Sequence, residues 1–252
     1  MNNIINKELI KKRFEKTLPT YADNAFVQKQ MALKLLAELI KKQGKNFEDV
    51  LEIGCGCGLL TENILSGLNF NNLYINDIVE KAVNNTKNLS PKIKKIYGDC
   101  ENITFPTNLD LIISNATFQW IFDFEALSGK IHSSLKKNGI FAFTTFGKSN
   151  LSQIKVLTGN SLRYYSQREI EILLNKKFEI IYSNSEIIKM EFDSAIDVLK
   201  HLKLSGVNSL EEKQWLKKDL EYFINKCDRN FKSKSGKIEL TYNPLYFIAK
   251  KT

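Results

Sequence analysis

The spacing of apolar residues predicts a helical N-terminal segment. Within residues 1–45 the apolar positions recur with the period of an amphipathic helix. The positions that carry this period are Leu33, Leu36, Ala37, Leu39 and Ile40. Gly44 follows them where a helix C-cap is expected, so we predict that the helix ends there.

From Val50 onward, apolar runs alternate with segments of helical character. The runs typical of buried strands are DVLEIG (49–54), NLYINDI (72–78), IKKIYGD (93–99), DLIISNATFQWI (110–121) and GIFAFTTFG (139–147). Helices are expected between them over 59–68, 79–88 and about 125–135. This alternation predicts an α/β fold in which a mostly parallel sheet carries helices on both faces.

The pattern changes after Gly147. The expected elements are a helix over 166–175 that Ser166 caps, a long strand or a hairpin over 178–192, helices over 193–203 and 211–226, and a closing strand over 238–251. The two helices between the last two strand-like runs are predicted to be an insertion over the sheet that is able to act as a lid.

Length, composition and charge narrow the class of protein. A chain of 252 residues with 43% hydrophobic residues is long enough to bury a core as one large α/β domain. No stretch approaches the roughly 18 apolar residues of a membrane helix, and the N-terminus lacks an apolar signal core, so we expect a cytoplasmic protein. The net charge of +9 indicates either a lysine-rich solvated surface or an acidic partner, and the sequence leaves both open.

The four cysteines form neither a disulfide framework nor a metal-binding pattern. Cys55 and Cys57 lie within a glycine run, and no second pair follows at zinc spacing. Cys100 and Cys227 are isolated. We therefore expect no metal, and we interpret Cys55 and Cys57 as small residues of a tight turn.

The run VLEIGCGCG (50–58) is the most informative short stretch of the chain. Gly54, Gly56 and Gly58 have the spacing G-x-G-x-G, whereas a dinucleotide fingerprint has G-x-G-x-x-G. Glu52, in the strand just before the turn, would repel a phosphate and suits a cationic ammonium group. The pattern predicts a turn beneath an uncharged or zwitterionic part of a ligand.

Two more acids stand at the ends of the next two strands. Asp77 follows Gly58 by about twenty residues, where a carboxylate accepts the hydroxyls of a ribose. Asp99 ends the third strand, where a carboxylate meets the exocyclic amine of an adenine. Open α/β sheets bind ligands at this edge, so three successive acids favour an adenosyl ligand over three unrelated turn residues.

This constellation resembles the class I S-adenosylmethionine-dependent methyltransferases over residues of about 45–150. The resemblance implies a Rossmann-like fold, S-adenosylmethionine as the cofactor and S-adenosylhomocysteine as the product. It places the glycine turn under the methionine part, Asp77 at the ribose and Asp99 at the adenine. The cofactor-binding residues that it implies are Glu52, Gly54, Gly56, Gly58, Asp77, Ile78, Asp99, Cys100 and Asn115.

The residues after the fourth strand narrow the acceptor. Enzymes that methylate amino groups of nucleobases or glutamine carry Asn or Asp, then two prolines and an aromatic residue at this point. The residues here are Asn115, Ala116, Thr117 and Phe118, which do not support that chemistry. NPLY at 243–246 is a near match, but it lies in the last strand, and we interpret it as a strand with a bulge.

Six segments carry a closer resemblance to the malonyl-acyl-carrier-protein O-methyltransferases of biotin synthesis. They are RFEKTLPTYADNAFVQ (13–28), SNATFQW (114–120), FTTFG (143–147), LRYYSQREI (162–170), HLKLSGVN (201–208) and LTYNPLY (240–246), which together span nearly the whole chain. Cys57 departs from the family pattern, in which Thr, Ser or Pro is frequent. We accordingly divide a single domain, 1–252, into an N-terminal helical cap (1–45), a cofactor-binding core (46–150) and a substrate-facing part with the lid and last strands (151–252).

The resemblance implies transfer of a methyl group from S-adenosylmethionine to the free carboxylate of a malonyl thioester on an acidic acyl carrier protein. The methyl ester would start pimeloyl and biotin synthesis. A carboxylate with a pKa of about 4 is already ionised at neutral pH, so positioning suffices and no acid–base residue is required. Neither a nucleic acid nor a membrane is expected as a partner.

Burying the malonyl carboxylate calls for a cation, and a guanidinium fits best. Arg163 is the first candidate, followed by Lys203 and Arg13. The residues expected to line the pocket beside them are Tyr21, Gln119, Trp120 and Tyr242.

Two other functions remain open from the sequence. One is a methyltransferase for another small carboxylic acid, of the trans-aconitate type, which shares the cofactor turn. The other is a non-catalytic S-adenosylmethionine-binding assembly factor. An RNA methyltransferase is disfavoured, since the aromatic residues do not form a recognisable nucleic-acid surface.

Overall fold

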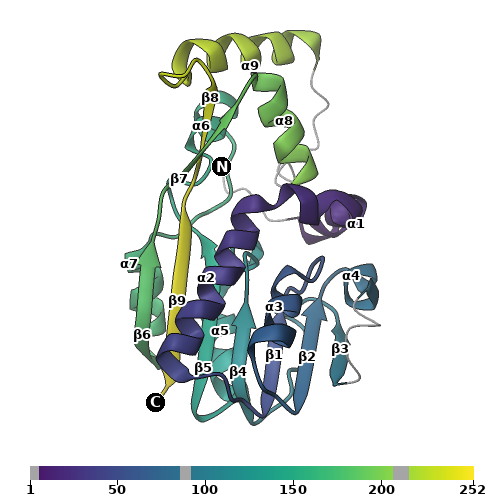
Figure 1. Cartoon of the computed structure of the whole chain (residues 1–252), viewed down its shortest axis with the longest axis vertical. Coiled ribbons are helices and arrows are strands. Elements are labelled where there is room, and N and C mark those ends of the chain that lie inside the picture. Colours follow the sequence, from purple (N-terminus) through teal and green to yellow (C-terminus); the bar gives the residue numbers. More distant parts are fainter. Residues whose placement is uncertain (1–5, 86–91, 207–215) are drawn as a thin grey trace.

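A seven-stranded sheet forms the centre of the protein (Figure 1). The computed structural model describes residues 6–85, 92–206 and 216–252. The strands of the sheet are β1 (Asp49–Ile53), β2 (Asn72–Asp77), β3 (Ile93–Tyr97), β4 (Leu109–Ser114), β5 (Leu135–Phe146), β6 (Phe178–Ser185) and β9 (Pro244–Lys251), and a small second sheet pairs β7 (Ile188–Phe192) with β8 (Ile238–Tyr242). The order is β3-β2-β1-β4-β5-β9-β6, with β9 antiparallel to both of its neighbours and the first five strands parallel. The predicted mostly parallel α/β sheet is confirmed.

Helices cover both faces of this sheet (Figure 1). They are α1 (Lys7–Asn24), α2 (Phe26–Gln43), α3 (Leu59–Gly67), α4 (Glu80–Asn85), α5 (Phe124–Ser134), α6 (Ser152–Thr158), α7 (Gln167–Leu174), α8 (Ala195–Leu204) and α9 (Lys217–Asn230), with a 3-10 turn η1 (Phe118–Trp120). Among the described helices, none combines the length and the apolarity needed to cross a membrane.

Alternating residues of β1 pack against opposite helical layers. Leu51 and Ile53 belong to the core that α5 and α7 complete, whereas Val50 belongs to the core completed by α2 and α3. The two-residue period of a strand places neighbouring side chains on opposite faces. A strand covered on both sides is therefore mostly apolar, and the one buried acid in β1, Glu52, is an exception that needs a reason.

At one edge of the sheet, two successive strand pairs form a narrow ribbon, and the second pair lies beyond the sheet. β6 pairs with β9, and after a short interruption β7 pairs with β8. The register is maintained across the break, from Ser185 opposite Leu245 to Ile188 opposite Tyr242. The expectation for 178–192 is therefore corrected, because its two halves pair with other strands and form neither an unbroken strand nor a hairpin.

Asn243 explains the interruption of the last strand. Its side-chain amide donates to Ser185 Oγ (3.1 Å) and to the carbonyl of Glu186 (2.7 Å). Its Oδ1 accepts from the amide of Ser149 (3.3 Å), and a Cβ on Gly147 would lie 2.3 Å from that oxygen. Asn243 thus ties the segments after β5 and β6 to the last strand, which agrees with the interpretation of NPLY as a strand irregularity.

The insertion between β7 and β8 consists of α8 and α9. Figure 1 shows both helices beyond the carboxyl ends of the parallel strands, with α1 between α8 and the sheet. Val198 and Leu202 of α8 and Phe223 of α9 join a core that also contains Tyr242 and Met31. The predicted helical insertion is confirmed, and it packs on the end of the sheet at which ligands of this fold bind.

Several element boundaries differ from those expected. The N-terminal segment forms two helices that meet at Ala25, and Gly44 ends the second with φ of 77°. β5 begins at Leu135, earlier than the predicted 139, and α6 was not predicted. The residues 86–88 and 211–215 of two predicted helices lie outside the described residues, and α9 extends to Asn230. The division into cap, core and substrate-facing part stays a prediction.

Candidate active site

A cavity opens at the carboxyl ends of β1, β2 and β4, beneath α1 and the end of α8. The predicted cofactor residues that line it are Glu52, Gly54, Gly56, Asp77, Ile78, Asp99, Cys100 and Asn115. Gly58 is outside the lining and caps α3 with φ of 93°. The predicted substrate residues in the lining are Tyr21, Gln119, Trp120 and Tyr242.

The glycine turn brings the backbone against β4 more closely than a side chain would permit. Gly54 has φ of 74°, and a Cβ there would lie 2.1 Å from Thr117 Oγ1. The amides of Gly54 and Cys55 both donate to the carbonyl of Asn76 (2.8 and 2.9 Å). The turn is therefore fixed between β2 and β4, with its backbone exposed to the cavity.

Glu52 carries the least satisfied polar group of the site. It is fully buried, and Oε2 accepts a hydrogen bond from Thr61 Oγ1 (2.7 Å). Oε1 has no hydrogen-bond partner within the described parts of the chain. Burial raises the pKa of Glu52 to about 8. A buried carboxylate oxygen with no partner is costly, and it fits a cationic or hydrogen-bonding ligand in the cavity.

Asp77 is held by the turn that it supports. Its Oδ2 accepts from the amide of Gly56 (2.9 Å) and its Oδ1 from the amide of Val79 (2.8 Å). Burial raises the pKa of Asp77 to about 6, although hydrogen bonds from backbone amides favour the ionised form. Each oxygen keeps a lone pair, so the oriented carboxylate can accept two ligand hydroxyls.

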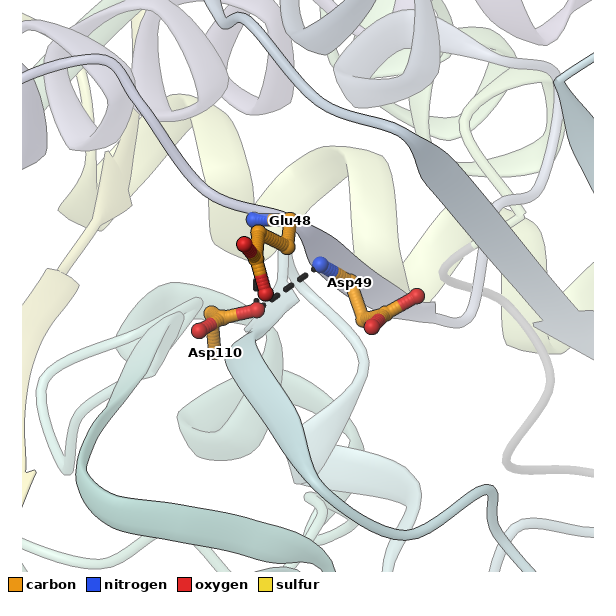
Figure 2. Close-up of side chains that lie close together, drawn as sticks. All are labelled: Glu48, Asp49 and Asp110. Atoms are coloured by element: carbon orange, nitrogen blue, oxygen red, sulfur yellow. Dashed lines mark hydrogen bonds between the residues drawn. The ribbon is translucent and has the colours of Figure 1, made fainter.

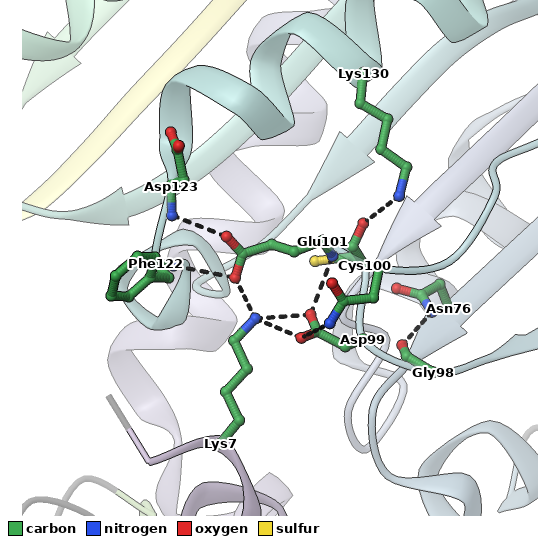
Figure 3. Close-up of polar contacts among 10 residues, drawn as sticks. Lys7, Asn76, Gly98, Asp99, Cys100, Glu101, Phe122, Asp123 and Lys130 are labelled. Atoms are coloured by element: carbon green, nitrogen blue, oxygen red, sulfur yellow. Dashed lines mark hydrogen bonds and ion pairs between the residues drawn. The ribbon is translucent and has the colours of Figure 1, made fainter. Parts of the chain in front are cut away.

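Asp99 is paired with a residue that the sequence did not indicate. Figure 3 shows Lys7, from the start of α1, between Asp99 and Glu101. Its Nζ lies 2.8 Å from Asp99 Oδ1 and 2.6 Å from Oδ2, and it also contacts Glu101. Burial lowers the pKa of Lys7, but the two hydrogen-bonded carboxylates outweigh it and the pKa is raised overall. Lys7 also lines the cavity.

Glu101 connects this ion pair to α5. Its carboxylate accepts from the amides of Phe122 (3.1 Å) and Asp123 (2.8 Å), just before the helix begins (Figure 3). Carboxylates are stabilised near helix N-termini, so Glu101 is a fixed anchor for Lys7. No local pattern could have indicated Lys7, because 92 positions separate it from Asp99.

The predicted cations are not part of the cavity lining, although Arg163 lines a small adjoining pocket together with Gln119 and Tyr164. These cations are Arg163, Lys203 and Arg13, of which Arg163 and Lys203 are exposed. The Arg163 guanidinium stacks on the ring of Tyr165, 5.4 Å from its centroid. The pairing of one of these cations with a bound carboxylate stays a prediction that the geometry does not favour.

Several polar residues of the lining were missed, among them Tyr164, Asn150 and Ser205. These three come from the segment after β5 and from the end of α8. Asn150 Nδ2 donates to the Tyr164 hydroxyl (3.0 Å). His201 of α8 contacts the hydroxyl of Tyr242 through Nε2 (2.7 Å) from outside the lining. Tyr164 adjoins Arg163 in the LRYY segment, which was the one available signal.

The cysteines of the site are thiols at neutral pH. Burial raises the pKa of Cys57 to about 11 and that of Cys100 to about 12, and it raises the pKa of Cys55 as well. A protonated thiol is a weak metal ligand and a weak nucleophile. These values agree with the interpretation of Cys55 and Cys57 as small turn residues.

An acidic cluster lies at the opposite end of the sheet. Figure 2 shows Glu48, Asp49 and Asp110 close together at the starts of β1 and β4. Asp110 Oδ2 accepts from the amides of Glu48 (3.2 Å) and Asp49 (2.8 Å), and Lys136 Nζ lies 3.0 Å from both Asp110 and Glu48. Lysine and backbone amides therefore balance these carboxylates, and they join two strand ends.

The fold and the cavity define a class I Rossmann-like methyltransferase. The family model of the methyltransferase domain matches residues 51–143. YcgJ from Bacillus subtilis matches with a TM-score of 0.62 and 14% identity, over 86% of this chain and 98% of that chain. The N-methyltransferase NodS from Bradyrhizobium japonicum, in complex with S-adenosyl-L-homocysteine, matches with a TM-score of 0.53 and 11% identity, over 92% and 98%.

Relatives of full length identify the family. A malonyl-[acyl-carrier protein] O-methyltransferase from Calditerrivibrio nitroreducens is 42% identical over 245 residues, 96% of each chain. The protein of the same name from Bacteroides thetaiotaomicron is 35% identical over 259 residues, 98% of this chain and 99% of that one. The chain belongs to the malonyl-[acyl-carrier protein] O-methyltransferase family, as its sequence motifs indicated.

Proposed function

We propose that this protein transfers a methyl group from S-adenosylmethionine to the free carboxylate of a malonyl thioester on an acyl carrier protein. The observation that carries the proposal is the extent of the similarity to relatives named for that reaction. It covers nearly the whole chain, including the N-terminal helices, the core and the insertion. A match limited to the methyltransferase core would support the cofactor alone, because the acceptor is chosen by the parts around it.

The cavity fits S-adenosylmethionine by the chemistry of its donors. Glu52 Oε1, which is buried and lacks a partner among the described residues, would take the ammonium of the methionine part. Asp77 would accept the ribose hydroxyls, and Asp99 the exocyclic amine of the adenine. The backbone of the glycine turn would lie under the methionine part, and the remaining lining residues expected beside the cofactor are Ile78, Cys100 and Asn115. When bound, the cofactor supplies an electrophilic methyl group on a sulfonium.

The composition of the lining supports a carboxylate as the acceptor. Histidine is absent from the described residues that line the cavity, and the acids there lie at the proposed cofactor positions. A carboxylate is ionised at neutral pH and needs no base, whereas an amine or a hydroxyl would have to lose a proton. The acceptor oxygen forms a bond to the methyl carbon while the carbon–sulfur bond breaks and its electrons stay on sulfur, so no proton moves.

The protein's contribution to this displacement is alignment and the exclusion of water. α1 and the end of α8 border the cavity from opposite ends of the chain, with Tyr21 from the first and Ser205 following the second. Holding oxygen, carbon and sulfur in line removes most of the entropy of a bimolecular reaction. Water exclusion strengthens the attraction between the anionic acceptor and a cationic sulfonium.

The net charge of +9 supports an acidic carrier protein as the partner, through electrostatic steering of the encounter. We place the reaction in the cytoplasm, where malonyl thioesters are made. The absence of a metal from the reaction stays an expectation.

The test is transfer of labelled methyl from S-adenosylmethionine to malonyl-acyl carrier protein, with free malonate and trans-aconitate in parallel. We expect label on the thioester alone, removable by mild alkaline ester hydrolysis. Label on a free acid alone would assign another acceptor. Cofactor binding without transfer to any of the three would favour a non-catalytic role.

A further inference from the structure

The charge in the cavity raises the question of how an anionic acceptor is held there. Among the described lining residues, Glu52, Asp77 and Asp99 are acids and Lys7 is the sole cation. Lys7 is already bound to Asp99 and Glu101. A carboxylate that enters the cavity therefore meets no uncommitted side-chain cation within the described lining, and its hydrogen bonds must come from neutral donors.

Tyr164 is one such donor, and a neighbour fixes the direction of its hydroxyl. Asn150 is buried, and its Oδ1 accepts from the amide of Asn243 (3.2 Å), which establishes which end of its side chain carries the NH₂ group. That NH₂ group donates to the Tyr164 hydroxyl oxygen at 3.0 Å. Since the oxygen accepts from Asn150, the hydroxyl proton is left to be donated elsewhere, and Tyr164 lines the cavity.

Tyr242 is held in the same way from the insertion. Its side chain is almost wholly buried, and His201 Nε2 lies 2.7 Å from its hydroxyl. Burial lowers the pKa of His201, so the imidazole is neutral at pH 7 and can donate through Nε2–H. When Nε2–H donates, the Tyr242 oxygen accepts, and the Tyr242 proton is left for the cavity.

The phenols share one region of the cavity. Tyr21, Tyr164 and Tyr242 all line it, from α1, the segment after α6 and the end of β8. We infer that the hydroxyls of Tyr164 and Tyr242 bind the acceptor carboxylate, that Asn150 and His201 are positioning residues that direct these hydroxyls, and that Arg163 takes no part. The inference rests on the proposed function and concerns how that site holds its substrate.

Neutral donors also suit the reaction better than a salt bridge would. The acceptor loses its negative charge as its oxygen bonds to the methyl carbon and the carbon–sulfur electrons pass to sulfur. A guanidinium would stabilise the free carboxylate more than the transition state, in which that charge is partly lost, and would raise the barrier. A phenol hydroxyl orients the oxygen with a smaller penalty of this kind.

The first experiment compares Tyr164→Phe, Tyr242→Phe and Arg163→Ala with malonyl-acyl carrier protein at saturation. We expect each phenylalanine variant to lower kcat by about 10- to 100-fold, because the acceptor oxygen is no longer aligned with the methyl group, while the cofactor Kd is kept. Arg163→Ala should keep kcat. Loss of kcat in Arg163→Ala, with normal kcat in both phenylalanine variants, would overturn the inference.

The second experiment tests whether His201 acts through Tyr242. His201→Phe should lower kcat in the wild-type background and have no further effect in Tyr242→Phe, since its target hydroxyl is then absent. His132→Phe is the matched control, because that histidine packs on Phe178 away from the cavity. Independent losses in the double variant would overturn the positioning role. A wild-type protein that methylates no malonyl thioester would instead refute the proposed function itself.

Discussion

Lys7 and Asp99, which both line the cavity, form an ion pair with Nζ 2.6 Å from Oδ2. Asp99 is also the carboxylate assigned to the adenine amine. A bound adenine must therefore share or displace the ammonium on that carboxylate, while Glu101 offers Lys7 a second anchor. We therefore expect the N-terminal helix and the cofactor to be coupled through the Asp99 side chain.

Replacing Lys7 should strengthen cofactor binding. In Lys7→Met the adenine amine no longer competes with an ammonium, and we expect the Kd for S-adenosylmethionine to fall by about 3- to 10-fold, in line with a partly exposed ion pair. Isothermal titration calorimetry measures it. Lys11→Met is the control on the same helix, because Lys11 bonds to the exposed Tyr97 instead. A rise in Kd would mean that the pair holds α1 over a bound cofactor.

Glu52 should make the cofactor-free protein less stable as the pH rises. Its pKa is about 8 in the folded protein against 4.5 without burial, so the folded state retains a proton that the unfolded state loses between these values. The free energy of unfolding therefore falls with pH across that window, by up to about 1.4 kcal/mol per pH unit, and is level above the folded pKa.

The range from about pH 7.5 to 8 isolates this effect, because an unfolded histidine with a pKa of about 6.5 is still half protonated at pH 6.5. Asp77, with a pKa of about 6, and the two histidines, whose pKa values are lowered from 6.5, contribute little there. Urea unfolding should show a falling stability for the wild type and a flat one for Glu52→Gln. A flat wild-type profile would mean that the Glu52 carboxylate is already ionised in the folded, cofactor-free protein.

Cofactor binding should have the opposite pH dependence. If Glu52 Oε1 takes the ammonium, the cofactor binds the ionised form, and its affinity rises with pH up to about 8. Calorimetry in buffers of different ionisation enthalpy should detect release of a proton on binding at pH 7. Glu52→Gln should abolish that release and weaken binding by about 10- to 100-fold. Equal proton release in the variant would assign the proton to another group.

Gly54 and Gly44 have similar positive φ values but different surroundings. Their alanine variants therefore distinguish backbone strain from a steric clash of the added Cβ. Gly54→Ala combines φ of 74° with a Cβ 2.1 Å from Thr117 Oγ1, whereas Gly44→Ala has φ of 77° and open space within 4 Å. We expect Gly44→Ala to lose about 1 kcal/mol of stability and to bind the cofactor normally. Gly54→Ala should lose more stability and should bind the cofactor weakly. Equal behaviour of the two would show that the turn tolerates displacement.

The basic surface should matter for the carrier protein alone. Raising the salt concentration should increase the KM for malonyl-acyl carrier protein and leave the Kd of the cofactor nearly unchanged, because exposed charges are screened and buried contacts are not. Steady-state rates at low and high ionic strength measure this. A KM independent of salt would mean that the lysines form a solvated surface and do not attract the carrier protein.

The site residues that the sequence predicted are those with a signal in their local sequence. Glu52 lies in β1, Asp77 ends β2 and Asp99 follows β3 by two residues, so strand order alone brings them to one edge. Lys7, Asn150 and His201 reach the site through contacts of helices and loops distant in sequence, which no periodicity encodes. Arg163, the first candidate from the sequence, is not part of the cavity lining, whereas its neighbour Tyr164 is.

The arrangement of the last strands also depends on contacts that the sequence does not reveal. The apolar runs 178–192 and 238–251 were found, but their division into two sheets depends on Asn243, whose amide bonds to Ser185 and Glu186 across the ribbon. A single polar residue in an apolar run is compatible with a bulge, a turn or a break. Its hydrogen-bond partners decide among these, and they are known only from the folded chain.

The most direct test of the account is the intact mass of malonyl-acyl carrier protein after incubation with this protein and S-adenosylmethionine. We predict a mass increase of one methylene group, absent without the cofactor and reversed by mild alkaline hydrolysis. An unchanged mass, with cofactor binding intact by calorimetry, would contradict the central claim.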